Sequence, residues 1–260
     1  MRAIWSGAIS FGLINIPVNV YSGAESRDGL DLRMLHKKDD APIRYAKICT
    51  AEDKEVPFDE IVKGYEYAKG EFVVLNDEDF EAADVKKTST IDIVEFADEN
   101  QIDVRYLERP YYLEPQKGGD KAYALLREAL RKRNRLAVAT FVLRQREHLA
   151  LIKTVGQVLV LNQLRFPADL RSPGGLKLPA KDGADKRELD MALKLVDQLT
   201  HPFIAEDFHD TYTEELQERI EAKVKGKPAP KKTAEPAVAT HDLMAALKAS
   251  LESPHKTSKK

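Results

Sequence analysis

Acidic residues followed closely by a lysine are the first groups in this sequence that could do chemistry. Glu52 stands two residues before Lys54, and Glu60 stands three residues before Lys63. Paired carboxylates hold Mg²⁺, and a lysine can activate the attacking water, so a metal-dependent nuclease is one interpretation. The chain contains 43 acidic residues in all, and in such a chain these spacings also arise by chance.

Other nucleophiles and metal ligands add little to this candidate. Cys49 is the single cysteine, so it cannot form a disulfide within the chain or build a four-cysteine zinc site, and it favours a reducing compartment. The six histidines are scattered, and no nucleotide-binding loop, nucleophile elbow or HExxH motif occurs. We therefore expect no catalytic residue, no stoichiometric zinc or other metal, and no cofactor.

Charge is distributed unevenly along the chain, although the formal net charge is only −2. Residues 51–100 carry five lysines and sixteen acidic residues, a net of −11, whereas residues 101–165 carry thirteen basic and six acidic residues, a net of +7. Local potential rather than net charge steers a charged ligand, so this asymmetry suits a protein that binds a polyanion on one surface. Ordinary solvated charge gives the same counts, and both interpretations stay open.

The composition indicates a folded globular protein that is not exported. Hydrophobic residues make up 43% and charged residues 32% of the chain, which excludes the disordered, collagen-like and multispan membrane classes. Residues 3–24 lack charge and follow Arg2 as a signal-peptide core would. The aliphatic residues at even positions from Ile14 to Val20 alternate with other types, however, and this period of two predicts strands with one buried face. We expect a cytoplasmic protein.

Strands dominate the expectation for the first two thirds of the chain. Residues 30–75 are expected to form short strands and loops, including a strand through Leu30, Leu32 and Met34, and residues 77–84 a short acidic helix. A helix opens after Gly119 with an apolar stripe at Ala122, Leu125, Leu126, Ala129 and Leu130. Consecutive strands with short turns favour a barrel or a sandwich. Strands are expected at residues 3–24, 89–96, 106–113, 136–143, 149–155 and 158–164.

The final third is expected to be helical, with a tail. Asp185 and Glu188 form a capping-box-like pair before one amphipathic helix, and Thr211 and Glu214 repeat that signal before a second helix that ends near Gly226. Residues 227–239 are rich in Pro, Lys, Ala and Thr, which predicts an extended linker. The segment 240–253 then places four apolar residues on one helical stripe: Leu243, Met244, Leu247 and Leu251.

Long blocks of this sequence resemble prokaryotic Ku. The first block runs from Met1 to Val18, and further blocks follow in the family's order over roughly residues 1–226. These further blocks are Leu35–Lys38, Ile43–Tyr45, Glu55–Pro57, Ile61–Tyr67, Thr90–Phe96, Pro110–Leu113 and Lys117–Leu130. One departure concerns metal binding, because many members carry a Cys-x-x-Cys pattern where this chain has Cys49 followed by Ala51, Glu52 and Asp53.

The resemblance implies an α+β fold and a homodimeric ring. A strand-rich β-barrel core would occupy residues 1–183, with a bridge of short strands and loops at about residues 30–75. A helical dimerisation arm would occupy residues 184–226, and a flexible basic C-terminal tail with a partner-binding helix residues 227–260. The ring would encircle double-stranded DNA, load at broken ends and recruit a multidomain ATP-dependent DNA ligase for non-homologous end joining, at the nucleoid and without any catalysis of its own.

A ring that accepts any broken end contacts phosphates and does not read bases. By their place in the resembling regions, the expected DNA contacts are Arg33, Lys37, Lys38, Arg44 and Lys47 in the bridge and Arg131, Arg133, Arg144 and Arg146 on the barrel. Each of them could equally be a solvated surface residue. A metal nuclease and a generic strand-rich interaction module remain the alternative classes.

The two apolar helix faces predict protein contacts. The dimer interface is expected at Leu189, Leu193, Val196, Leu216 and Ile220, with core packing within one subunit as the rival explanation. The tail segment carries no signal for packing on its own chain, so its four apolar residues are expected to bind the ligase. Residues 227–260 carry seven lysines against three acidic residues, so a DNA-binding tail is the alternative.

Overall fold

The computed structural model describes residues 1–25, 30–83, 89–144, 146–180, 185–226 and 243–252. The chain divides into two compact units, Met1–Ser26 with Arg33–Ser172 and Arg27–Leu32 with Pro173–Lys260. No helix within these described ranges is long and apolar enough to cross a membrane.

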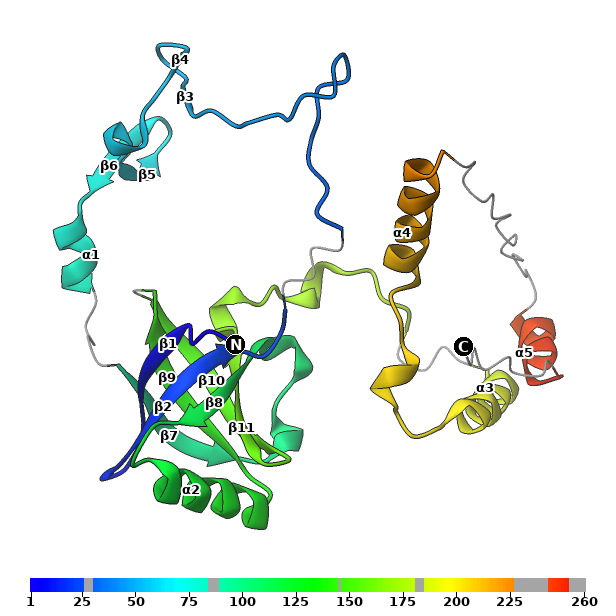
Figure 1. Ribbon diagram of the computed structural model, residues 1–260. Helices are drawn as coiled ribbons and strands as arrows, with labels where there is room; N and C mark the ends of the chain where they lie inside the picture. Colours follow the sequence, from blue (N-terminus) through cyan, green and yellow to red (C-terminus); the bar gives the residue numbers. More distant parts are fainter. Residues whose placement is uncertain (26–29, 84–88, 145, 181–184, 227–242, 253–260) are drawn as a thin grey trace. The chain divides into compact units, whose positions relative to one another are not determined.

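A closed barrel forms the core of the first unit (Figure 1). The strands follow one another around the barrel in the order β1-β2-β8-β11-β10-β9-β7, and only the closing pair, β1 with β7, is parallel. The expected β-barrel is therefore confirmed. Its strands are β1 (Trp5–Phe11), β2 (Ile14–Ser22), β7 (Thr90–Ala97), β8 (Leu107–Pro115), β9 (Leu136–Leu143), β10 (Arg146–Val155) and β11 (Val158–Leu164).

Aliphatic side chains from every barrel strand fill the interior. Along β2, Ile16, Val18 and Val20 are buried as their alternation predicted, but Ile14 is 37% exposed because it lies beside the β1–β2 turn. The two-residue turn between β10 and β11 places Gly156 at a φ of +57°, a conformation that favours glycine. The fully buried large side chains are Ile9, Ile16, Val18, Ile91, Leu113, Ile152, Leu159 and Leu161.

Helix α2 (Asp120–Arg133) packs against the barrel and ends at Asn134, whose left-handed φ of +48° closes the helix. The expected apolar stripe was wrong at two positions, because Leu125 is 60% exposed and Ala129 is exposed as well. The buried residue is instead Tyr123, whose hydroxyl donates to the Leu113 carbonyl and accepts from the Leu159 amide, each at 2.7 Å. These two bonds offset the cost of burying a polar ring and join α2 to β8 and β11.

The bridge (residues 30–75) buries none of its side chains. Its strands are β3 (Ile48–Cys49) with β4 (Lys54–Glu55) and β5 (Lys63–Ala68) with β6 (Glu71–Leu75), two antiparallel pairs, followed by α1 (Asp77–Ala83). The strand expected through Leu30, Leu32 and Met34 was wrong, since no neighbouring chain pairs with it beyond a single bridge at Leu35. Short 3₁₀ turns complete the unit at Phe58–Glu60, Glu99–Gln101, Val104–Tyr106 and Pro167–Asp169.

Three helices make up most of the second unit: α3 (Lys186–Leu199), α4 (Thr211–Val224) and α5 (Leu243–Glu252), with 3₁₀ turns at Pro173–Gly175 and Ala205–Asp207. The side chain of Asp185 caps α3 by accepting from the amides of Arg187 and Glu188, as expected. For α4 the expected cap was one residue late, because Asp210 accepts from the Thr213 amide at 3.1 Å. Helix α5 lies against α3 (Figure 1), although no pattern in the sequence indicated that it packs on its own chain.

Candidate nucleic-acid interface

Four of the five cations expected in the bridge belong to one small hairpin. The Ile43 amide donates to the Met34 carbonyl at 2.9 Å, and the His36 amide donates to the Ala41 carbonyl at 2.8 Å. Lys37 and Lys38 therefore sit at the tip, while Arg33 and Arg44 flank the paired residues, and all four side chains are exposed. Inside the turn, Asp39 accepts from its own neighbours, the His36 ring and the Ala41 amide. The lysines at the tip are left facing solvent.

The fifth bridge cation has an aromatic partner. The Lys47 ammonium lies 4.4 Å from the centre of the Phe58 ring, a cation–π contact that leaves its positive charge in place.

The single cysteine of the bridge lies in a polar turn, where amide hydrogen bonds from Ala51 and then Glu52 lower the pKa of the Cys49 thiol. Ala51 and Glu52 lie within the β3–β4 turn. The described residues contain no group of three or more His, Cys, Asp or Glu placed to hold a metal ion, and the expectation of no zinc remains a prediction.

The four barrel arginines expected at DNA separate into two pairs. Arg131 and Arg133 lie in the last turn of α2, just before β9, whereas Arg144 and Arg146 lie in the turn after β9. Eight residues of strand stand between the pairs, or roughly 26 Å at about 3.3 Å per residue. In the last turn of α2 the cations also suit the negative end of the helix dipole. The four residues therefore do not form a single patch.

Ion pairing distinguishes these arginines further. Arg131 Nη2 lies 2.7 Å from Glu128 Oε2, and this bond lowers the pKa of the Glu128 carboxyl. Arg105 is paired with Asp103 and Arg135 with Asp98. Neither Arg144 nor Arg146 forms an ion pair within the described chain, so their charges are available to an external anion.

Arg144 and Arg146 line a cavity of about 800 Å³ at the end of the barrel where β9 turns into β10. A third arginine, Arg109 of β8, joins them there; it was not expected from the sequence. The β8–β11 register places Arg109 opposite Gln163, and Arg109 also lacks an ion pair within the described residues. Its place next to Pro110, in a resembling block, gave no hint of a functional role. The other lining residues are Ile4, Ser22, Ala24, Glu25, Glu108, Pro110, Tyr111, Leu143, His148 and Gln163.

A hydrogen-bonded network fixes the inner wall of this cavity. Gln163 is only 8% exposed, and its carbonyl accepts from the Tyr111 hydroxyl at 3.2 Å. Its amide group lies 3.1 Å from His148 Nδ1 and 3.2 Å from Glu108 Oε2, and His148 Nε2 lies 3.3 Å from the Leu143 carbonyl. Because the amide donates to Nδ1, the histidine proton belongs on Nε2, where it can reach Leu143. The wall is thus held in one arrangement.

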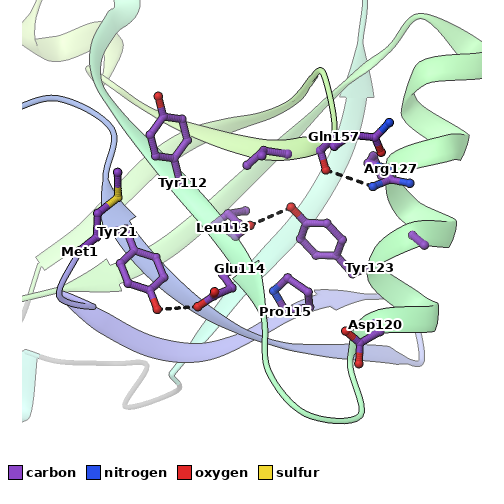
Figure 2. A pocket seen from close by; sticks show the side chains of 12 residues that line it. Met1, Tyr21, Tyr112, Leu113, Glu114, Pro115, Asp120, Tyr123, Arg127 and Gln157 are labelled. Carbon is purple, nitrogen blue, oxygen red and sulfur yellow. Dashed lines mark hydrogen bonds between the residues drawn. The ribbon is translucent and has the colours of Figure 1, made fainter.

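A second cavity, of about 630 Å³, lies between α2 and strands β2, β8 and β11 and has a different character (Figure 2). Two of its polar side chains have partners, and the first is Tyr21, which donates to Glu114 at 2.5 Å, a bond that raises the pKa of the tyrosine. Arg127 donates to the Gln157 carbonyl at 3.0 Å. Its one arginine is therefore already engaged, and this cavity does not suit a polyanion as the first one does.

The expected protein-contact residues lie on the second unit. Leu189, Leu193 and Val196 of α3 are between 48% and 59% exposed. Leu216 and Ile220 of α4 are half-buried, as are Met244, Leu247 and Leu251 of α5. The side chain of Leu243 lies outside the described set. The apolar face of α3 thus remains half open to water.

Comparison with known proteins places the barrel in a class. A family model described as the Ku70/Ku80 beta-barrel domain matches residues 10–191. Proteins named "Non-homologous end joining protein Ku" from Opitutus terrae and Bacillus subtilis are 44% and 39% identical to this chain over 225 and 257 residues. The matches cover 86% and 97% of this chain and 81% and 82% of those proteins.

A protein of the same name from Archaeoglobus fulgidus is 40% identical over 255 residues, which span 97% of this chain and 99% of that protein. The chain belongs to the Ku family. The resemblance drawn from the sequence is therefore confirmed.

Proposed function

We propose that this chain forms a homodimeric ring that binds double-stranded DNA ends without sequence specificity and serves non-homologous end joining as a scaffold rather than as an enzyme. The observation that carries the proposal is membership in the Ku family, whose similar relatives bear the name of that pathway. The exposed bridge cations and the barrel arginines that form no ion pair within the described residues give the chain the chemistry that DNA binding needs.

Phosphate contacts explain how such a protein accepts any end. Lys37, Lys38, Arg33 and Arg44 project from one hairpin into solvent, where each can neutralise a phosphate and release a counterion. Contacts of this kind carry no sequence information. Binding should therefore weaken steeply as salt rises, equally for all sequences.

Exposed apolar surface supports the dimer. The α3 face of Leu189, Leu193 and Val196 is half open to water, and a second copy of the chain would cover it. The bridge also exposes fourteen large hydrophobic side chains. They are Leu32, Met34, Leu35, Ile43, Tyr45, Ile48, Phe58, Ile61, Val62, Tyr65, Tyr67, Phe72, Val73 and Val74.

The tail is proposed to recruit a multidomain ATP-dependent DNA ligase. Met244, Leu247 and Leu251 recur at helical spacing along α5, which gives the helix an amphipathic face of the kind that fills a groove; because α5 lies against α3, recruitment would require α5 to exchange α3 for the ligase. Leu247→Asp should abolish stimulation of the ligase and leave DNA-end binding intact. Neutralising Lys256, Lys259 and Lys260, which lie outside the described residues, should change salt-sensitive DNA affinity instead. Full stimulation by the Leu247 variant would refute recruitment.

One assay separates the scaffold from the metal nuclease. A blunt duplex of defined length should be retarded in a mobility-shift gel and should stay intact when Mg²⁺ is added. Glu52 and Lys54, one of the two candidate nuclease pairs, are both exposed on the β3–β4 hairpin. Cleavage that requires Mg²⁺ and disappears in Glu52→Gln would overturn the proposal in favour of the nuclease.

A further inference from the structure

Three arginines without ion-pair partners in the described chain meet at one cavity, at the end of the barrel where β9 turns into β10. We propose that this cavity binds a nucleoside phosphate. The inference deepens the proposed function and rests on it in part, because Arg144 and Arg146 belong to the barrel side of the proposed DNA-binding surface. The inference adds Arg109 to these two arginines and assigns the cavity a small ligand that is distinct from duplex DNA.

The size of the cavity points to a small ligand. Its volume of about 800 Å³ falls within the range of about 300–1,000 Å³ that is usual for small-molecule sites. A duplex could only touch the rim of such a hollow. A single nucleotide, or a nucleoside with two or three phosphates, can enter it.

The charges at the cavity select an anion with a polar body. Arg109, Arg144 and Arg146 outnumber the two carboxylates, Glu25 and Glu108, and planar guanidinium groups match the geometry of phosphate oxygens. The two carboxylates would repel a bare phosphate. They can accept hydrogen bonds from ribose hydroxyls or from the amino group of a base, which a nucleoside supplies.

The walls suit the rest of a nucleotide. Ile4, Pro110 and Leu143 provide apolar surface for a sugar or a base. Beside them, the network around Gln163 holds Tyr111 and His148 in fixed positions before any ligand arrives. A preformed wall lowers the entropy that binding would otherwise lose.

The contrast with the second barrel cavity strengthens the assignment. In that cavity Arg127 donates to a backbone carbonyl and Tyr21 to Glu114, so these two side chains already have partners (Figure 2). At the β9–β10 end, the three guanidinium groups have no carboxylate partner within the described chain. Arg127 of the second cavity, by contrast, also lies 3.7 Å from a carboxylate oxygen of Glu128.

The test measures binding of adenosine triphosphate to the full-length protein by isothermal titration calorimetry, with tripolyphosphate and adenosine as partial ligands. We expect the triphosphate to bind more tightly than either part. Arg109→Ala and, separately, Arg146→Ala should each weaken its binding by about tenfold or more. The matched control is Arg171→Ala, an exposed arginine that does not line the cavity, which should leave nucleotide binding unchanged.

A second arm distinguishes the source of the nucleotide. A short single strand with a 5′-phosphate is compared with the same strand bearing a 5′-hydroxyl. Competition by the phosphorylated strand alone assigns the cavity to the terminal nucleotide of an overhang, and competition by neither strand assigns it to a free nucleotide. Both outcomes support a nucleoside phosphate site.

The inference is overturned if the wild type binds no nucleotide at millimolar concentration, or if Arg109→Ala binds the triphosphate as tightly as wild type does. Tighter binding of tripolyphosphate than of the nucleotide would reduce the site to a nonspecific anion site and would also overturn it. Failure of the proposed function looks different. In that case duplex ends would not bind to wild type, whatever the nucleotide result.

Discussion

The barrel and the bridge both contain strands with large hydrophobic side chains, but the barrel buries these side chains and the bridge exposes them to water. Barrel strands β10 and β11 bury Ile152, Leu159 and Leu161 completely, whereas bridge strands β5 and β6 leave Tyr65 and Phe72 more than 60% exposed. The barrel closes on itself and so has an interior that side chains can fill. A two-stranded hairpin has no interior and is at best marginally stable alone in water.

This difference in burial indicates which contacts stabilise each part. The barrel's stability is its own, because its core clusters include side chains from all seven strands and from α2. The bridge must draw stability from a surface that the described part of the chain does not provide. A partner subunit and DNA are the surfaces that the proposed function supplies.

The largest expected effect is on the stability of the barrel. Ile152→Ala removes a fully buried side chain from β10 and should lower the free energy of unfolding by about 2–5 kcal/mol, through reduced burial and a cavity. Val74→Ala in the bridge, where the side chain is 58% exposed, should change it by less than about 0.5 kcal/mol. Trp5, the only tryptophan, packs against the barrel core, so its fluorescence during urea unfolding reports both values. If Ile152→Ala and Val74→Ala lowered the free energy of unfolding equally, the proposed difference in stability between barrel and bridge would be wrong.

The next effect is on assembly. Leu193→Asp combined with Val196→Asp places two charges on the half-exposed face of α3 and should yield folded monomer that no longer holds DNA. Sedimentation velocity measures the state, and circular dichroism verifies the fold. Lys194→Asp, on an exposed neighbouring position, is the control and should stay dimeric. A double variant that remains fully dimeric would assign these residues to core packing within one subunit.

A smaller effect is expected from the bridge cations. Lys37→Gln with Lys38→Gln should weaken duplex-end binding by about tenfold and reduce the slope of log K against log salt by about 0.9 for each phosphate that is no longer neutralised. Unfolding of the barrel should not change, because both side chains are exposed. Lys69→Gln, in the β5–β6 turn, is the matched control. If the slope of log K against log salt were unchanged in the double variant, these lysines would not contact DNA phosphates.

The smallest effect concerns acid stability of the barrel unit. Hydrogen bonds from the Arg105 side chain and backbone lower the pKa of Asp103 from 3.8 to about 2. A carboxyl whose pKa is depressed in the folded state stabilises the fold above its unfolded pKa and loses that contribution as pH falls through the folded value. Wild type should therefore exceed Asp103→Asn in urea midpoint at pH 5, and the difference should vanish near pH 2.

The asparagine in this variant can still accept from the Arg105 amide, so the comparison isolates the charge. Measuring the midpoints from pH 2 to pH 5 gives the result directly. A constant difference between the two proteins across that range would contradict the assignment of the pKa shift to the Arg105 pair.

Local signals in the sequence predicted the elements well. Asp185 caps α3, and the alternation along Ile16, Val18 and Val20 marks a buried strand face. Alternation misled at Leu30 and Leu32, where no partner strand in the described chain buries one face. The same pattern therefore gives a strand only where a neighbour exists to pair with it.

Strand pairings between residues far apart in the chain could not be predicted from the sequence. Closure of the barrel depends on the parallel pairing of β1 with β7, which are about eighty residues apart in the chain. The cavity at the β9–β10 turn depends on the register that sets Arg109 beside Gln163. Periodicity along one strand carries no information about either pairing, so Arg109 could not be singled out as a site residue.

Threading on a free end is the central claim, and topology tests it most directly. A labelled linear duplex is bound to the full-length protein and challenged with the same unlabelled DNA, either linearised or as relaxed, covalently closed circles. A closed ring of protein predicts that linear DNA competes and that closed circles do not. Competition by closed circles as strong as that by linear DNA would contradict the ring and reduce the protein to a surface binder of phosphates.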